Sequence, residues 1–335
     1  MKELDAFKAF ISNPKKIVIT THANPDADAL GSSLGLYHFL NNRGHEVTVI
    51  SPTEYPEFLY WMEGNDQVLV DNEKNHNEYV RIINESDLIC CLDFNGYKRI
   101  KKLETPVEQS PAKKLLVDHH LNPEINADFE LWDKTAAATA ELIYDLILML
   151  DGADEINLAI AEALYAGIMT DTGSFRHGST SAKIHRTVAA LMDHGADVNK
   201  ISRLIYDTNS LNRLRFIGYA LMEKLVVNAD YKVAYFVINA EEHERFHLKS
   251  GDTEGLVNYA LSIKGIVAAA IIMEKNGEVK MSFRSIGNYA VNDFAAKYFN
   301  GGGHKNAAGG LSDVGLDATV EKFKSLIPEI QQTHK

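Results

Sequence analysis

Four short apolar runs alternate with longer segments of helical periodicity, and this alternation constrains the fold more than any other feature. The runs cover residues 16–20, 46–50, 87–94 and 114–120. Most are near-continuous rather than alternating, which is typical of parallel strands covered on both faces. Helix-like segments lie between and after them, at 28–42, 75–85, 135–150, 156–169 and 181–194. The pattern predicts an α/β domain with a doubly wound, mainly parallel sheet.

The last part of the chain has a different pattern, and 335 residues exceed the usual size of one domain. Alternating runs occur at 232–239 and 265–285, and the second is divided by Asn276-Gly277, a strong hairpin signal. Helices at 253–263, 290–299 and 316–326 would complete a second, smaller α/β domain. We therefore expect a first domain at 1–195, a polar helical linker at 196–225 and a second domain at 226–335.

Composition and termini place the chain among globular proteins of the cytoplasm. Hydrophobic residues make up 45% and charged residues 24%, both ordinary values. The N-terminal ten residues carry acidic groups and lack the apolar core of a signal peptide. No run approaches the ~18 apolar residues of a membrane helix. The adjacent Cys90 and Cys91 would point to opposite faces of a strand, so we expect reduced packing residues rather than a disulfide.

The net charge of -12 is unevenly distributed. Residues 216–335 carry 13 Lys and Arg against 14 Asp and Glu, so the remaining 21 against 32 give residues 1–215 a net charge of -11. Such a surface argues against an electrostatic grip on long nucleic acid. The acidic excess fits a first domain that holds divalent metal, and it equally fits a generally acidic surface.

Acidic and histidine clusters occur just past the expected strands, where open α/β sheets bind their ligands. One such carboxylate is routine: Asp28 alone could be a helix N-cap, and a His-His pair is often a polar turn. Four clusters at successive strand exits are harder to explain in this way. They are His22, Asp26 and Asp28; Asp93; Asp118, His119 and His120; and Asp171, which follows an apolar segment.

These side chains indicate the kind of metal. "NPDADALGSS" has alternating aspartates but lacks the glycine and the final glutamate of a calcium loop. Cysteine-free His/Asp ligation favours Mn²⁺, Mg²⁺ or Fe²⁺ over structural zinc. Two ions about 3.5–4 Å apart, bridged by a carboxylate, would polarise a phosphoryl oxygen and generate hydroxide near neutral pH. The pattern therefore indicates hydrolysis at phosphorus.

The same motifs resemble those of the DHH phosphoesterase superfamily. "HANPDAD" at 22–28, Asp93, "DHH" at 118–120 and "DTGSF" at 171–175 correspond to its four motifs in order. "SFRS" at 282–285 and "GGGHKNAAGG" at 301–310 resemble its DHHA1 domain. The resemblance implies a DHH catalytic domain and a smaller DHHA1 substrate-binding domain across a cleft. A chain without further modules is most similar to the NrnA-type subgroup, which are nano-RNases that also dephosphorylate 3′-phosphoadenosine 5′-phosphate.

The resemblance also implies a role for each matching residue. His22 and Asp26 would bind one metal ion, and Asp93 would bridge it to a second. Asp28, His119 and Asp171 would hold the second ion. For both ions Mn²⁺ is the expected metal, with Mg²⁺ or Fe²⁺ as alternatives. Asp118 would orient its histidine neighbour. His120 would face the scissile phosphate, either steadying its developing charge or assisting the leaving oxygen.

Substrate contacts are expected in the second domain. The glycine stretch has a simple interpretation as a helix end and flexible link, but consecutive glycines also let backbone N–H groups approach a phosphate. The resemblance assigns Gly301, Gly302, Gly303 and His304 to the substrate. Arg284 is the only arginine among the last ninety residues and suits a bidentate phosphate contact. Arg176 and His177 are weaker candidates that could simply be exposed.

The expected activity is therefore metal-dependent hydrolysis of di- to pentanucleotides to mononucleotides, and of 3′-phosphoadenosine 5′-phosphate to AMP, by a two-metal-activated hydroxide. The alternative is a phosphodiesterase acting on pApA or cyclic di-AMP. A pyrophosphatase would be expected to have a different second domain, and a RecJ-type exonuclease would need a longer chain. A non-catalytic nucleotide sensor would be expected to have lost metal ligands. Neither long duplex nucleic acid nor a membrane is an expected partner, and helix 201–222 could pair with a second copy.

Overall fold

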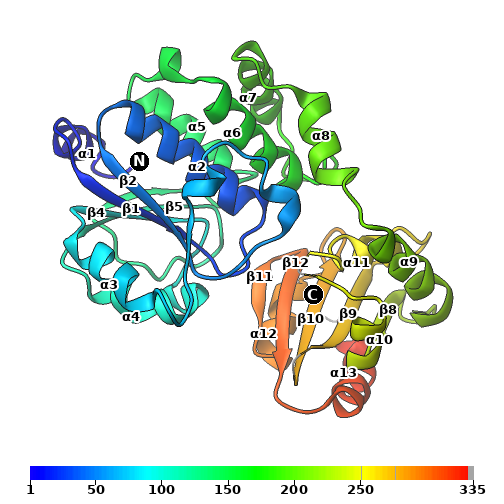
Figure 1. The fold of residues 1–335 in the computed structure, drawn as a ribbon. Coiled ribbons are helices and arrows are strands. Elements are labelled where there is room, and N and C mark those ends of the chain that lie inside the picture. Colours follow the sequence, from blue (N-terminus) through cyan, green and yellow to red (C-terminus); the bar gives the residue numbers. More distant parts are fainter. Residues whose placement is uncertain (250, 276, 331–335) are drawn as a thin grey trace. The chain divides into compact units, whose positions relative to one another are not determined.

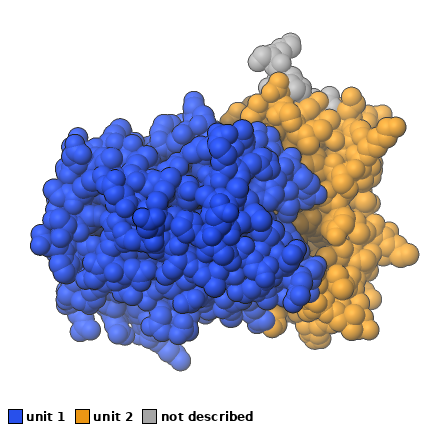
Figure 2. Space-filling view, turned by 90° about the horizontal axis from the view of Figure 1, so that it is seen from above, with its two compact units in different colours: residues 1–208 blue, residues 209–335 orange. Residues whose placement is uncertain are grey.

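The computed structural model describes residues 1–249, 251–275 and 277–330. The chain forms two compact units, Met1–Thr208 and Asn209–Lys335, which Figure 2 shows in different colours. The boundary falls within the segment 196–225, so that α8 (Val198–Tyr206) belongs to the first unit and α9 (Leu211–Tyr219) to the second. No helix in the described ranges is both long and apolar enough to cross a membrane.

The first unit is built on a six-stranded sheet in the order β3-β2-β1-β4-β5-β6, with every neighbouring pair parallel (Figure 1). This confirms the predicted parallel sheet and places its topological switch between β1 and β4, where such sheets bind ligands. The strands are β1 (Lys16–Thr21), β2 (Glu46–Ser51), β3 (Leu69–Val70), β4 (Leu88–Leu92), β5 (Lys113–Asp118) and β6 (Phe129–Trp132).

Helices cover both faces of this sheet, as a doubly wound fold requires. Side chains alternate along each strand, so Cys90 joins the core on one face and Cys91 the core on the other, and both are free thiols as predicted. The first face packs α1 (Leu4–Phe10), α2 (Ala27–Asn42), α5 (Thr139–Met149), α6 (Leu158–Asp171), α7 (Ala182–Asp193) and α8. The second packs α3 (His76–Glu85), the 3₁₀ segment η3 (Tyr97–Leu103) and α4 (Glu104–Gln109). Short 3₁₀ turns lie at Glu57–Leu59, Asn65–Gln67 and Ala153–Glu155.

Close packing of α2 on α6 depends on glycine. A Cβ on Gly31 would lie 2.3 Å from the Ala163 carbonyl oxygen, and one on Gly167 would lie 2.8 Å from Asp28 Oδ1. The two helices can therefore approach within backbone contact beside Asp28. At the other end of α2, Gly44 has a φ of +83°, which is the left-handed helix stop that the sequence predicts.

The second unit contains a mixed sheet in the order β11-β12-β10-β9-β8-β7. The β8–β9 pair is parallel and the other pairs are antiparallel. Its strands are β7 (Leu225–Asn228), β8 (Val233–Ile238), β9 (Ala268–Lys275), β10 (Glu278–Ser285), β11 (Gly302–His304) and β12 (Ala307–Ser312). The predicted β9–β10 hairpin is present; Asn276 of its turn lies outside the described residues, and Gly277 has a φ of +77°.

Helices again cover two faces of this sheet. One core joins the sheet to α12 (Val291–Tyr298) and α13 (Leu316–Ile330). The other joins it to α9, a π-helical turn at Ala220–Lys224, and α11 (Leu256–Leu261), while α10 (Ala240–Arg245) follows β8. The glycine stretch 301–310 forms the paired strands β11 and β12. Its interpretation as a flexible link is therefore wrong.

Candidate metal centre

The predicted ligands converge at the carboxyl end of the first unit's sheet. Three sets of side chains each place ligand atoms within 4.8 Å of one another. Asp93 belongs to two of these sets. The sets are His22, Asp26 and Asp93; Asp28, His119 and Asp171; and Asp93, Asp118 and His120.

The first set is built by the loop after β1. A carbonyl can only accept, so Nδ1 of His22 donates to the Ala23 carbonyl at 2.9 Å. In the neutral ring Nε2 is then the nitrogen that offers a lone pair. That Nε2 lies 3.4 Å from Asp93 Oδ2 and 4.0 Å from Asp26 Oδ2. The other oxygen of Asp26 caps α2, accepting from the backbone N–H groups of residues 28 and 29 at 3.0 Å. The N-cap is therefore Asp26, and the interpretation of Asp28 as a cap of this helix is wrong.

Asp28 instead closes the amino end of a different helix. Its Oδ2 accepts from Thr139 N at 2.7 Å and its Oδ1 from Ala140 N at 2.8 Å, at the start of α5. The N-cap position of α5 is Ala138, whose side chain offers no acceptor. A carboxylate at a helix amino terminus satisfies unpaired N–H groups and suits the helix dipole. Only 1% of Asp28 is exposed, so this anchoring fixes a buried carboxylate at the site.

His119 faces three carboxylates. Its Nε2 lies 3.4 Å from Asp171 Oδ2, 3.5 Å from Asp93 Oδ1 and 3.9 Å from Asp28 Oδ2. Its Nδ1 donates to the Ala136 carbonyl at 3.2 Å, so in the neutral ring Nε2 again offers the lone pair. This arrangement, with one ring nitrogen held by a carbonyl, is usual for metal-ligating histidines.

Asp171 reaches this set from a helix rather than from a strand. The prediction that it lies at a strand exit is wrong, because it is the last residue of α6. This helix has 11 consecutive buried residues, and the run after Glu162 resembles a buried strand when only the sequence is considered. A carboxylate beside the negative end of a helix dipole is unfavourable in the absence of a cation.

Asp93 lies between the two sets of ligands. One of its oxygens points toward His22, and the other lies near His119 and accepts from Thr139 Oγ1 at 2.8 Å. It follows β4 with a φ of +64°, an uncommon conformation for a side-chain-bearing residue. Only 2% of Asp93 is exposed.

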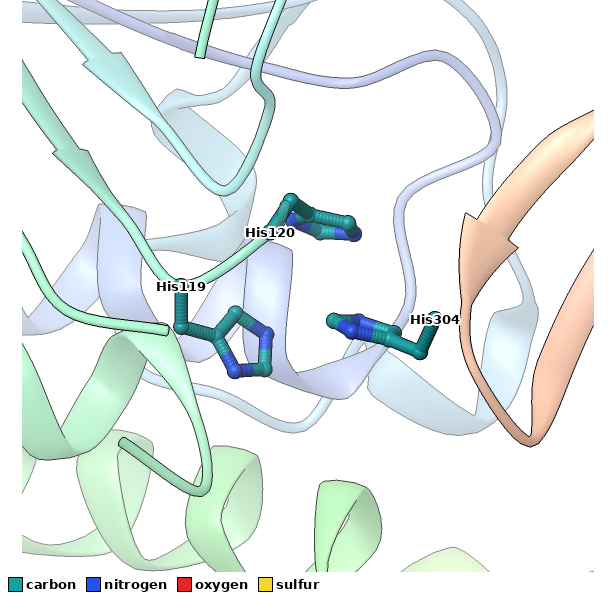
Figure 3. Close-up of side chains that lie close together, drawn as sticks. All are labelled: His119, His120 and His304. Atoms are coloured by element: carbon teal, nitrogen blue, oxygen red, sulfur yellow. The ribbon is translucent and has the colours of Figure 1, made fainter. Parts of the chain in front are cut away.

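The end of β5 directs its two histidines differently, as Figure 3 shows. Their rings are nearly perpendicular, at 76°, with centroids 5.1 Å apart. Asp118 Oδ1 accepts from His120 Nδ1 at 2.7 Å, so the histidine that Asp118 orients is His120. Trp132 Nε1 donates to the His120 carbonyl at 2.7 Å and fixes the backbone. Asp118 Oδ2 is buried and has no hydrogen-bond partner among the described residues.

The carboxylates and imidazoles shift one another's pKa values. Burial, followed by the charges of Asp93 and Asp171, raises the pKa of Asp28 well above its usual value. Burial also raises the pKa of Asp93, but the contact with His22 and the charges of the histidines outweigh it and lower the pKa overall.

The pKa values of the three histidines do not all shift in the same direction. Burial lowers the pKa of His22 and of His119, but neighbouring aspartates outweigh it and raise both values overall. For His120, burial prevails over the Asp118 hydrogen bond, and the pKa is lowered.

The donor set fits divalent metal ions. Its nitrogen–oxygen distances of 3.4–4.0 Å exceed those of hydrogen bonds. The three shortest, 3.4–3.5 Å, match ligands that share one cation, since donors about 2.1 Å from an ion lie about 3–3.5 Å apart. The Nε2 atoms of His22 and His119 both face carboxylates, and a cation between these atoms would satisfy the imidazoles and the carboxylates together. Imidazole and carboxylate donors without cysteine suit Mn²⁺, Mg²⁺ or Fe²⁺.

The structure places Arg176 and His177 in a tight turn after Asp171. Gly173, Ser174 and Phe175 all have positive φ values, between 57° and 64°. Arg176 Nε donates to the Gly173 carbonyl at 2.8 Å, and His177 Nδ1 donates to the Asp171 carbonyl at 3.2 Å. Both side chains therefore brace the turn that follows a predicted ligand.

In the second unit, Arg284 and His304 share one face of the sheet. His304 pairs with Ala307, and Ala307 pairs with Arg284, so the two side chains stand on the same face two strands apart, about 9–10 Å. Figure 3 labels His304 on β11.

The three glycines before His304 differ in what they permit. A Cβ on Gly301 would lie 2.0 Å from the Gly309 oxygen, and one on Gly303 would lie 2.5 Å from the Ala307 oxygen. A Cβ on Gly302 would meet nothing within 4 Å. The hairpin itself therefore requires Gly301 and Gly303, and Gly302 leaves the surface open.

Sequence reasoning missed the residues that hold the ligands. Thr139, Ala140 and Ala136 contact the aspartates and His119 mainly through backbone groups. Backbone donors carry no sequence signal. Only the threonine at the expected start of a helix, with its hydroxyl bonded to Asp93, offered a hint.

The fold and the site together define a family. Residues 16–168 match the DHH family, N-terminal domain, and residues 230–333 match the DHHA1 domain. The chain belongs to the DHH family. It is 38% identical to the solved structure of an exopolyphosphatase-related protein from Bacteroides fragilis, with a TM-score of 0.92 over 99% of this chain and 97% of that one.

Two curated relatives are informative. The chain is 29% identical to the bifunctional oligoribonuclease and PAP phosphatase NrnA of Bacillus subtilis, over 88% of each chain. It is 23% identical to the cyclic-di-AMP phosphodiesterase GdpP of Geobacillus thermodenitrificans, over 96% of this chain and 48% of that protein.

Proposed function

We propose that this chain is a metal-dependent phosphoesterase that hydrolyses di- to pentanucleotides to mononucleotides and 3′-phosphoadenosine 5′-phosphate to AMP. The observation that carries the proposal is the pair of His/Asp ligand sets that lie on either side of Asp93. Membership of the DHH family supports phosphoester chemistry. Similarity over 88% of the chain to a relative named for both activities supports these substrates.

The two ligand sets would each hold one divalent ion. His22 and Asp26 would hold the first, Asp28, His119 and Asp171 the second, and Asp93 would serve both. Such ions supply Lewis acidity that polarises a phosphoryl oxygen and makes water a better nucleophile near neutral pH. We prefer Mn²⁺, with Mg²⁺ and Fe²⁺ as ions that accept the same donors.

Asp118 and His120 would take part in proton transfer rather than in metal binding. The bond from His120 Nδ1 to Asp118 fixes the ring, so proton exchange with a substrate would use Nε2. The lowered pKa of His120 favours the neutral ring, which is able to accept a proton. After accepting one, the imidazolium would stabilise negative charge on the phosphoryl group or protonate the leaving oxygen.

The second unit would bind the rest of the substrate. Arg284 offers a planar guanidinium suited to two phosphate oxygens, and His304 stands on the same face beside the open Gly302. The first 215 residues carry a net charge of -11, which disfavours long polyanions. A few local phosphate contacts therefore suit short substrates.

Hydrolysis of pApA or cyclic di-AMP is a second candidate function. The similarity to GdpP, which spans 96% of this chain, favours it. Identity to that relative is lower, and this chain corresponds to about half of its length. Both candidates use the same metal centre, so only a comparison of substrates separates them.

The test is one Mn²⁺-containing assay with separate substrates: di- to pentanucleotides, 3′-phosphoadenosine 5′-phosphate, pApA, cyclic di-AMP and pyrophosphate. Mononucleotides from the short oligomers and phosphate from the bisphosphate are the expected products. Turnover confined to pApA or cyclic di-AMP would establish the second candidate instead. Absence of all turnover, with metal bound, would overturn both.

A further inference from the structure

We propose that Arg99 binds the phosphoryl group that is hydrolysed at the metal centre. The proposal deepens the proposed function and rests on it, since it names a residue that contacts the substrate there. Arg99 belongs to none of the sequence motifs. It lies six positions after Asp93, in η3, on the opposite side of the sheet from the helices that carry Asp28 and Asp171.

Two hydrogen bonds, each accepted by a backbone carbonyl, hold the segment 95–99 between two motif loops. The Ala23 N–H, directly after His22, donates to the Arg99 carbonyl at 2.8 Å. Asn95 Nδ2 donates to the Leu121 carbonyl at 2.7 Å, directly after His120. The residue following Arg99, Ile100, is fully buried in the core and anchors the turn. Arg99 is therefore fixed next to the loops of both histidines.

The charge of Arg99 reaches both rings. It is among the groups that lower the pKa of His22 and of His120, after the larger effect of burial. These two histidines contact Asp93 from different directions, through His22 Nε2 at 3.4 Å and His120 Nδ1 at 3.7 Å. Together with the backbone contact to Ala23, these effects indicate that the guanidinium would be within reach of a phosphoryl group bound at the ions.

The guanidinium has no partner within the described part of the chain. Arg99 is half-buried, yet its side chain makes no hydrogen bond or ion pair there. Lys102 of the same segment, by contrast, lies 3.5 Å from Glu73. Acidic residues outnumber basic ones 32 to 21 in residues 1–215, so carboxylate partners are plentiful. An unpaired half-buried guanidinium in this setting suits an anionic ligand.

The geometry of the guanidinium specifies the ligand class. Its five N–H donors form a rigid fork that matches two oxygens of a phosphate or carboxylate. The predicted ions favour a phosphoryl group over a carboxylate, because a phosphoryl group carries more charge and has more oxygens to share between the ions and the fork. Arg99 would therefore orient the phosphoryl group and stabilise its charge.

The test compares Arg99→Gln, Arg99→Lys and a matched control, Lys102→Gln, which removes a paired charge from the same segment. Steady-state kinetics with a dinucleotide and with 3′-phosphoadenosine 5′-phosphate give kcat and KM. Competitive inhibition by inorganic phosphate measures anion binding directly. Tryptophan fluorescence during urea unfolding verifies the fold, since both tryptophans, Trp61 and Trp132, lie in the first unit.

We expect Arg99→Gln to lower kcat/KM about 10- to 100-fold for both substrates, with a matching rise in the inhibition constant of phosphate. Arg99→Lys keeps the charge but loses the fork, and is expected to fall between the wild type and Arg99→Gln. Lys102→Gln is expected to match the wild type. If Arg99→Gln fails to fold, the kcat/KM and phosphate inhibition of Arg99→Lys alone test the proposal.

The outcomes separate this proposal from the proposed function. A wild-type protein that hydrolyses neither substrate contradicts the proposed function. An active wild type whose Arg99 variants keep the kcat/KM and phosphate inhibition of Lys102→Gln overturns the role of Arg99 and leaves the metal centre intact. Loss of kcat/KM with unchanged phosphate inhibition also overturns it, because a purely structural effect would then explain the loss.

Discussion

The hydroxyl of Thr139 provides the sharpest test of how the metal centre is supported. Thr139 is fully buried, and its Oγ1 donates to Asp93 Oδ1 at 2.8 Å. Thr139→Val replaces this donor with a methyl group of similar size and keeps the backbone N–H that binds Asp28. The change leaves one oxygen of a carboxylate that is only 2% exposed without this donor.

The expected loss follows from the chemistry of that bond. A hydrogen bond to a charged group contributes about 1.5–3 kcal/mol, so the unfolding free energy of the first unit should fall by that amount. For a unit of this size, the midpoint of thermal unfolding should fall by about 2–4 °C for each kcal/mol lost. Because Thr139 orients a predicted ligand, Mn²⁺ affinity should also fall about 10- to 100-fold.

Urea unfolding followed by tryptophan fluorescence measures the first unit selectively, since Trp61 and Trp132 both lie in it. A chelator removes the contribution of bound ions, and calorimetric titration with Mn²⁺ then gives the affinity. Thr139→Ser is the control, because it keeps the hydroxyl and loses only the methyl group. A valine variant within about 0.5 kcal/mol of the wild type, or no weaker in Mn²⁺ binding than the serine variant, would refute this reasoning.

Three further predictions use the same assays. Gly167→Ala should destabilise the first unit by about 1–3 kcal/mol, because its Cβ would lie 2.8 Å from Asp28 Oδ1. Gly178→Ala, in the same unit and with nothing within 4 Å, should not, and equal effects would contradict this. Asp171→Asn should stabilise the chelated protein by about 0.3–1 kcal/mol while weakening Mn²⁺ binding, and stability and binding that fall together would contradict the helix-end argument. Lowering the pH from 8 to 6 should stabilise the chelated first unit, because the pKa values of His22 and His119 are raised and the native state takes up protons there before the unfolded chain does. Stability that instead rises toward pH 8 would show that these shifts do not dominate.

Much of the fold could be predicted because the buried strands have a strong apolar pattern. The four predicted strands of the first unit appear as β1, β2, β4 and β5. The edge strands β3 and β6 were missed, since β3 has two residues and β6 four, too few for a clear period. The short strands β11 and β12 were missed because glycine has low strand propensity, and here cross-strand pairing overrides it.

The candidate site was predictable where side chains carry the chemistry. His and Asp at strand exits predicted the ligand sets, because parallel strands end at one edge of the sheet. The sequence could not show that Asp171 comes from a helix, that Asp26 rather than Asp28 caps α2, or that Asp28 closes α5. Those facts depend on long-range backbone contacts, which leave no local pattern. Arg99 belongs to the same category, since only the tertiary structure places it beside His22.

The most direct test of the central claim is a titration of the chelated protein with Mn²⁺, in which bound ions and dinucleotide turnover are measured at each point. The account predicts two ions per chain, with turnover appearing as the second is bound. Asp93→Ala, which keeps the fold but removes the carboxylate that serves both sets, should bind fewer ions and lose turnover. Full turnover with one ion per chain, or in the Asp93→Ala protein, would contradict a centre built from two ligand sets that share Asp93.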